Sequence, residues 1–220
     1  MRVMVAAAAL MCCFACRNQS GDDGFDSGKN YLPLSVGNWQ EFLIDSIFID
    51  DFSQSSETTS FWVRYTVSDT FIDLEGRTAY QVLVEKRYSD TASYRPNHQF
   101  AVVVDGFRAE VDKFSMRTVA LVFPPASGKT WDANAFNAFP EQLFRYDYVD
   151  KATAVGALSF DSTLRVLQTV DTANFVEKSY AEERYARSVG LIYREQYHIV
   201  RKLQADSGFH LIQRIVGYSQ

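Results

Sequence analysis

Apolar and polar residues alternate along several stretches of the chain with a period of two. In residues 61–68, every second residue is Phe, Val or Tyr, and the same pattern returns in residues 80–87 and 158–170. This period is typical of a strand that is buried on one face. Short alternating stretches separated by polar loops predict an all-β, antiparallel domain, either a strongly curved sheet or half-open barrel, or alternatively a sandwich.

Turn residues divide these stretches into hairpins. Asp105-Gly106 is a favoured pair for a tight hairpin turn. Near the C-terminus, residues 206–208 (DSG) predict a three-residue loop that joins a strand in 191–203 to one in 209–218. Residues 175–186 are ambiguous, because their apolar positions suit a helix as well as a strand.

The N-terminal stretch is a candidate export signal. Arg2 is followed by uncharged residues up to Ala15, a length typical of a signal peptide and below the ~20 residues that a spanning helix needs. The segment Cys13-Phe14-Ala15-Cys16 resembles a lipobox at its last two residues and departs from it at the first two. We expect a lipoprotein signal peptide in 1–15 and a fatty-acylated (palmitate-type) Cys16. A plain secretory signal is the alternative.

The remaining chain divides into a tether and one domain. Residues 16–30 are rich in Gly, Asp, Ser and Asn, a composition that predicts a flexible tether. Residues 31–220 are long enough for a single β-rich globular domain with its own core. All three cysteines lie within residues 1–16, so a disulfide is not expected in the domain.

Charge and motif spacing argue against several classes of partner. The formal net charge is −5 with acidic and basic residues interspersed, which argues against nucleic acid. Ser127-Gly128-Lys129-Thr130 ends like a phosphate-binding loop, but Phe123 stands where that motif needs its first Gly. We therefore expect a turn there, with no nucleotide and no cofactor.

The sequence assigns no catalytic or metal-binding residue. The chain has three histidines, without metal-ligand spacing. The predicted C-terminal hairpin register places His198 and His210 roughly 20 Å apart, at 3.3 Å per residue. No nucleophile elbow occurs either. Adjacent acids such as Glu182-Glu183 are expected to point to opposite strand faces. A non-enzymatic role is preferred.

The candidate ligand-binding residues lie on the predicted strand 191–203. Leu191, Tyr193, Glu195 and Tyr197 share one face, which we expect to be the core face. Glu195 is anomalous there, because a buried carboxylate needs a partner. Either a strand end or bulge turns it to water, or it lines a partly wet cavity beside the two tyrosines. In the second case Glu195, Tyr193 and Tyr197 would contact a ligand.

Three stretches resemble uncharacterised outer-membrane lipoproteins of the Bacteroidota: residues 31–39 (YLPLSVGNW), 123–137 (FPPASGKTWDANAFN) and 183–195 (ERYARSVGLIYRE). The last is similar to a strand motif of periplasmic proteins with an open, lipoprotein-carrier-like barrel. The resemblance implies that fold and a place in the cell envelope, at the outer membrane through the lipid anchor, on its periplasmic face or at the cell surface. It implies no catalytic residue.

Three functions remain open at this point. The first is a non-enzymatic binding or assembly module whose partners are envelope proteins. The second is a carrier or sensor of an apolar ligand such as a lipid, and the third is a hydrolase of envelope polymers. A packed interior favours the first and an apolar cavity the second.

Overall fold

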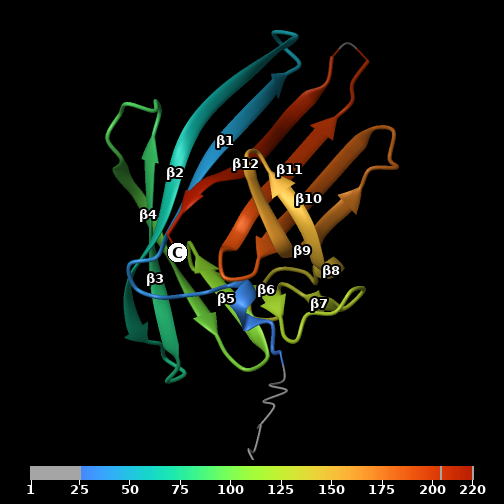
Figure 1. Ribbon diagram of the computed structural model, residues 1–220. Coiled ribbons are helices and arrows are strands. Elements are labelled where there is room, and N and C mark those ends of the chain that lie inside the picture. Colours follow the sequence, from blue (N-terminus) through green and yellow to red (C-terminus); the bar gives the residue numbers. More distant parts are fainter. Residues whose placement is uncertain (1–25, 204, 220) are drawn as a thin grey trace, which may run out of the picture.

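The structure is a computed structural model that describes residues 26–203 and 205–219. Twelve strands of this part form one antiparallel sheet, curved into a nearly closed barrel (Figure 1). The strands are β1 Trp39–Asp50, β2 Ser55–Ile72, β3 Thr78–Arg87, β4 Arg95–Val104, β5 Arg108–Lys113, β6 Met116–Val122, β7 Thr130–Asp132, β8 Leu143–Val155, β9 Leu158–Asp171, β10 Glu177–Ala186, β11 Gly190–Val200 and β12 Ser207–Tyr218. The predicted all-β, antiparallel, half-open barrel is confirmed.

The strands follow one another around the barrel as a meander, in the order β6-β5-β4-β3-β2-β1-β12-β11-β10-β9-β8-β7. The pairing of β1 with β12 joins the N-terminal and C-terminal halves. Residues 175–186, ambiguous in the sequence, contain the strand β10. A hairpin joins β4 and β5 at Asp105-Gly106 as predicted, but the turn is longer than these two residues, because Val104 pairs with Ala109 and the Asp105 carboxylate accepts from the amides of Phe107 and Arg108.

The barrel closes between its edge strands β6 and β7 through individual contacts. The Trp131 indole Nε1 donates to the carbonyl of Val119 at 2.9 Å, and the Val119 amide donates to the carbonyl of Ala133. The Tyr146 hydroxyl donates to the Val122 carbonyl and accepts from the Val122 amide, both at 2.9 Å. These bonds satisfy edge groups that a strand ladder would otherwise pair.

The core fills the barrel interior with alternate residues of the strands. Val63 and Val67 of β2 are buried, as the alternation in 61–68 predicts. The main cluster includes Phe42, Leu121 and Tyr146, and a smaller one consists of three valines on β2, β3 and β4 with aromatic and aliphatic neighbours. The two clusters share partly buried residues, so the core is continuous from one wall of the barrel to the other.

The predicted register of the C-terminal hairpin is wrong. Val200 pairs with Ser207, so the connection is longer than three residues and Gly208 lies within β12. A Cβ on Gly208 would meet the carbonyl oxygen of His198 at 2.0 Å, which explains glycine at this position. His210 lies opposite Tyr197, one step along β11 from His198, so the two histidines are neighbours on opposite faces of the sheet.

The predicted signal peptide, Cys16 and most of the tether lie outside the described residues. The last residues of the predicted tether contact the domain: Asp26 pairs with Arg187 at 2.7 Å, and the Asn30 carbonyl accepts from the Ser188 amide. A short 3-10 helix, η1 Lys29–Tyr31, precedes β1. No helix in residues 26–203 or 205–219 is long and apolar enough to cross a membrane.

Candidate ligand-binding cavity

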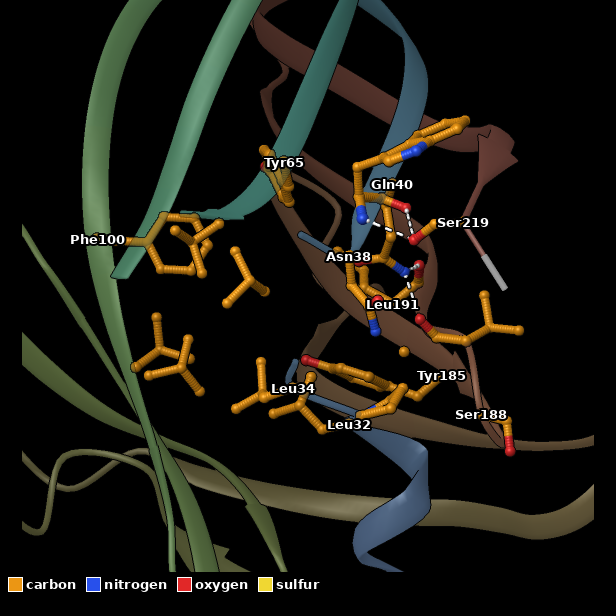
Figure 2. A pocket seen from close by; sticks show the side chains of 18 of the residues that line it. Leu32, Leu34, Asn38, Gln40, Tyr65, Phe100, Tyr185, Ser188, Leu191 and Ser219 are labelled. Carbon is orange, nitrogen blue, oxygen red and sulfur yellow. Dashed lines mark hydrogen bonds between the residues drawn. The ribbon is translucent and has the colours of Figure 1, made fainter. Parts of the chain in front are cut away.

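A cavity of about 140 Å³ lies inside the barrel (Figure 2). Its wall is formed on one side by β2, β3 and β4 and on the other by the β10–β11 hairpin. In Figure 2, Phe100 lies on one side, Leu191 and Tyr185 lie on the other, and Leu32 and Leu34 lie below. Six apolar residues that line it are Leu34, Val67, Val82, Phe100, Val102 and Val111. Most of these face inward because of the period-two alternation of their strands.

The floor of the cavity is formed by the N-terminal lead, residues 26–38. Tyr31 is fully buried and its hydroxyl donates to Asp150 Oδ1 at 2.7 Å. The Arg187 guanidinium lies 4.5 Å from the Tyr31 ring centroid. These contacts hold the lead across the end of the barrel, so that Leu32 and Leu34 point into the cavity.

Gln40 ties β1 to the turn of the β10–β11 hairpin. The Gln40 amide Nε2 donates to the carbonyls of Val189 and Leu191, both at 2.8 Å. A Cβ on Gly190 would lie 3.1 Å from the same nitrogen, so a glycine allows this approach. Gln40 therefore reaches past β12 and holds the β10–β11 turn against the start of β1, beside the cavity.

Charged groups also line the cavity. Arg194 and Lys113 are both among the lining residues. Arg194 Nε donates to Glu183 Oε1 at 2.7 Å, and the Tyr185 hydroxyl donates to Glu183 Oε2 at 2.6 Å. We call Lys113, Glu183, Tyr185 and Arg194 the interior cluster. It brings two cations to a largely apolar lining, with one carboxylate behind Arg194 and Tyr185.

Burial and charge change the protonation of this cluster. Burial, followed by the nearby Glu183 carboxylate and its hydrogen bond, raises the pKa of Tyr185 well above its ordinary value. Burial lowers the pKa of Lys113, and the Arg194 charge lowers it further. Lys113 forms no ion pair or side-chain hydrogen bond with any residue in the described ranges, whereas Arg194 has Glu183.

A further polar group is buried beside Arg194. Gln213 of β12 is only 1% exposed and pairs in register with Arg194 on β11 and Ile44 on β1. Its Nε2 has no hydrogen-bond partner among the described residues. Unpaired buried donors are rare in folded proteins, so this part of the interior carries more donors than acceptors.

The residues predicted from the sequence as ligand-binding do not line the cavity. Tyr193, Glu195 and Tyr197 alternate with Arg194, which does line it, so they lie on the outer face of β11. There the Tyr193 hydroxyl donates to Glu195 Oε2 at 2.8 Å, and His210 Nε2 lies 2.8 Å from Glu195 Oε1. Whether this outer group contacts a ligand stays a prediction.

A β-bulge explains why the predicted core face of β11 is wrong beyond Leu191. Arg184 of β10 pairs with Tyr193 of β11, but the next residue, Tyr185, pairs with Leu191. Ile192 therefore has no partner on β10 and forms the bulge. One extra residue reverses which face each later side chain occupies. Leu191 and Ile192 are therefore both buried, and Arg194 points inward in place of Tyr193.

The sequence contained a signal for Lys113 that our interpretation did not use. Ala109, Val111 and Lys113 share one strand face, so a lysine ends an apolar face. Arg194 gave no such signal, because the bulge hides its orientation. Within the part of the chain that the structure describes, no three His, Cys, Asp or Glu side chains gather as a metal site requires.

No protein-family model and no curated protein matches the sequence. Among solved structures, the chain is similar to a Bacteroides fragilis protein described as exported and as having a YmcC-like fold. The two are 12% identical, and the match covers 84% of this chain and 98% of the other with a TM-score of 0.42. Likeness at this level transfers neither a function nor a compartment.

Proposed function

We propose that this protein binds a small apolar molecule inside its barrel, as a carrier or sensor attached to the cell envelope through a lipid on Cys16. The observation that carries this proposal is the largely apolar cavity. We expect such a cavity in a ligand carrier, whereas we expect a packed interior in an assembly module. Envelope attachment rests on the signal-like residues 1–15 and on Cys16.

The size of the cavity supports binding and limits the ligand. Protein interiors are normally packed as densely as organic crystals. An apolar cavity of ~150 Å³ accepts a molecule of about the size of benzene, so a compact ligand or one segment of a longer chain fits here.

The other functions have weaker support. An assembly module would use exposed apolar residues, and Phe52, Phe175 and Leu203 are exposed at hairpin tips. Isolated exposed apolar residues are normal on folded proteins, however. A hydrolase would need a free carboxylate at the cavity, but both oxygens of Glu183 already accept hydrogen bonds, from Arg194 and Tyr185.

Filling the cavity tests the proposal. Val82→Phe adds a ring to a lining residue, and Val170→Phe makes the same change at an outward position that is 58% exposed. Ligand-observed NMR of the full chain with benzene and n-hexanol should show binding to the wild type and to Val170→Phe. Val82→Phe should lose it. Equal binding by Val82→Phe, or no binding by the wild type, contradicts the proposal.

Attachment is tested separately by metabolic labelling with a radioactive fatty acid. The wild type should be labelled and Cys16→Ala should not, because the thiol of Cys16 is the expected acylation site. An unlabelled, secreted wild type would remove the envelope anchor while leaving the cavity as a binding site.

A further inference from the structure

The interior cluster has an excess of positive charge. Glu183 is the single carboxylate in it, and its two oxygens are taken by Arg194 and Tyr185. Lys113 is then a second cation: it forms no ion pair among the described residues, and the Glu183 charge acts on its pKa less than burial and Arg194 do. Formally, two positive charges and one negative charge face the cavity, which leaves room for one more negative charge.

An ammonium that is partly desolvated and has no ion-pair partner is less stable than a fully hydrated one. Charged groups in protein interiors are normally paired, since desolvation disfavours the charged form. The cation–π contact of Lys113 is weak, because its Nζ lies 5.4 Å from the centroid of the Phe114 ring and Phe114 is exposed. Lys113 is half-buried, so its aliphatic stem packs beside Val111 while its ammonium lies toward the open space of the cavity.

We propose that the cavity selects a small monocarboxylate, with its apolar body between Leu34, Val82 and Phe100 and its carboxylate paired with the ammonium of Lys113. This inference rests on the proposed function, because it assumes that the cavity binds a ligand. Arg194 contributes a second positive charge but keeps Glu183 as its partner. The ligand carboxylate thus supplies the hydrogen-bond acceptor that Lys113 lacks.

Size and charge together narrow the ligand class. A cavity of this volume holds about one aromatic ring or a short alkyl chain, as in benzoate or hexanoate. A single negative charge balances the cluster, whereas a dianion such as hydrogen phosphate would overcompensate it. An inorganic anion would also leave the apolar lining residues, such as Val82 and Phe100, without a contact.

The test compares anionic and neutral probes of the same shape. Isothermal titration calorimetry of the full chain should show benzoate and hexanoate binding at least tenfold more tightly than benzamide and hexanamide. Inorganic phosphate should not bind measurably. If the amides bind as tightly as the acids, the cavity binds apolar ligands and the inference about charge is wrong. If none of these probes binds, the proposed function fails as well.

Variants assign the preference to Lys113. Lys113→Met keeps the length of the side chain and removes its charge, so benzoate affinity should fall tenfold or more while benzamide affinity stays unchanged. Lys151→Met removes an exposed lysine from the outer part of β8 and should leave both affinities as in the wild type. Unchanged benzoate binding by Lys113→Met overturns the inference. If Lys113→Met also loses benzamide binding, the substitution has damaged the cavity itself. The ratio of benzoate affinity to benzamide affinity in the wild type then decides whether the inference about charge holds.

Discussion

Glu182 and Glu183 are neighbours on β10, yet they belong to two different regions of the molecule. Their exposed fractions are 1% and 6%. Glu182 points outward, where its Oε1 accepts from Arg184 at 2.9 Å and its Oε2 accepts from Tyr180 at 2.6 Å. Glu183 points inward and accepts from Arg194 and Tyr185.

The two regions differ in how their charges balance. On the outer face, Arg165 and Arg184 meet Glu182 and Asp147, so two cations have two carboxylates. We call these four residues with Tyr180 the outer cluster. In the interior cluster, Glu183 alone meets Arg194 and Lys113. The outer network is balanced without a ligand, whereas the interior cluster has one more cation than carboxylates, which is the basis of the proposed anionic ligand. Both glutamates are buried, so burial of the carboxylate alone does not distinguish the outer cluster from the interior cluster.

The largest effect is expected from breaking the interior pair. Glu183→Gln removes the counter-charge of Arg194 and leaves two cations facing each other across the cavity. We expect a loss of about 3 kcal/mol in the free energy of unfolding, typical of removing one partner of a buried pair. Urea denaturation followed by circular dichroism measures it. A loss below that of the outer variant described next would contradict the comparison.

The outer cluster should tolerate the same change better. In Glu182→Gln, Arg165 keeps Asp147 as a partner, whereas in Glu183→Gln Arg194 loses its single carboxylate partner among the residues described. Repulsion from Glu195, which pairs in register with Glu182, is also relieved. We expect a loss of about 1–2 kcal/mol in the same urea experiment. A double variant of both glutamates should show nearly additive losses, since the sheet separates the two clusters.

Removing the unpaired cation should stabilise the protein. Lys113→Met exchanges a half-buried, unpaired charge for an apolar side chain of similar length, and we expect a gain of up to about 1 kcal/mol in the free energy of unfolding at pH 7. Thermal unfolding without added carboxylate measures it, with Lys151→Met as the control. A loss of stability would show that Lys113 has a structural partner.

The gain should depend on pH in a defined direction. Burial and then Arg194 lower the pKa of Lys113, so between that pKa and its ordinary value of ~10.4 the unfolded chain binds more protons than the folded one. The stability of the wild type therefore rises with pH in this window. The advantage of Lys113→Met should shrink as the pH rises through it. Tyr185 is present in both the wild type and Lys113→Met, so its own pH dependence cancels in the difference between their stabilities.

The smallest effect is expected at Glu195. Its partners Tyr193 and His210 lie with it on the outer face, in contact with solvent. Glu195→Leu should change the free energy of unfolding by less than about 1 kcal/mol and leave binding of benzoate unchanged. Altered benzoate affinity in calorimetry would return this residue to the ligand site that its sequence position suggested.

Much of the fold could be predicted from local patterns. The alternation in residues 61–68 identified the inward residues of β2, because no irregularity shifts the pairing of β2 with β1. On β11, the same reasoning placed Tyr193 and Glu195 inside, and one bulge at Ile192 reversed their orientation. Such a bulge depends on the partner strand, so alternation within β11 could not reveal it.

The sequence by itself determined that this chain forms an antiparallel β domain, since the pleat of a strand imposes a period of two on every half-buried segment. Only the tertiary structure decided which residues meet inside. Lys113 and Glu183 lie seventy positions apart in the chain, and the lead that carries Leu34 closes the same space from the other end. A cavity arises where side chains from distant segments fail to fill the volume between them, and that volume is set by strand order, register and closure.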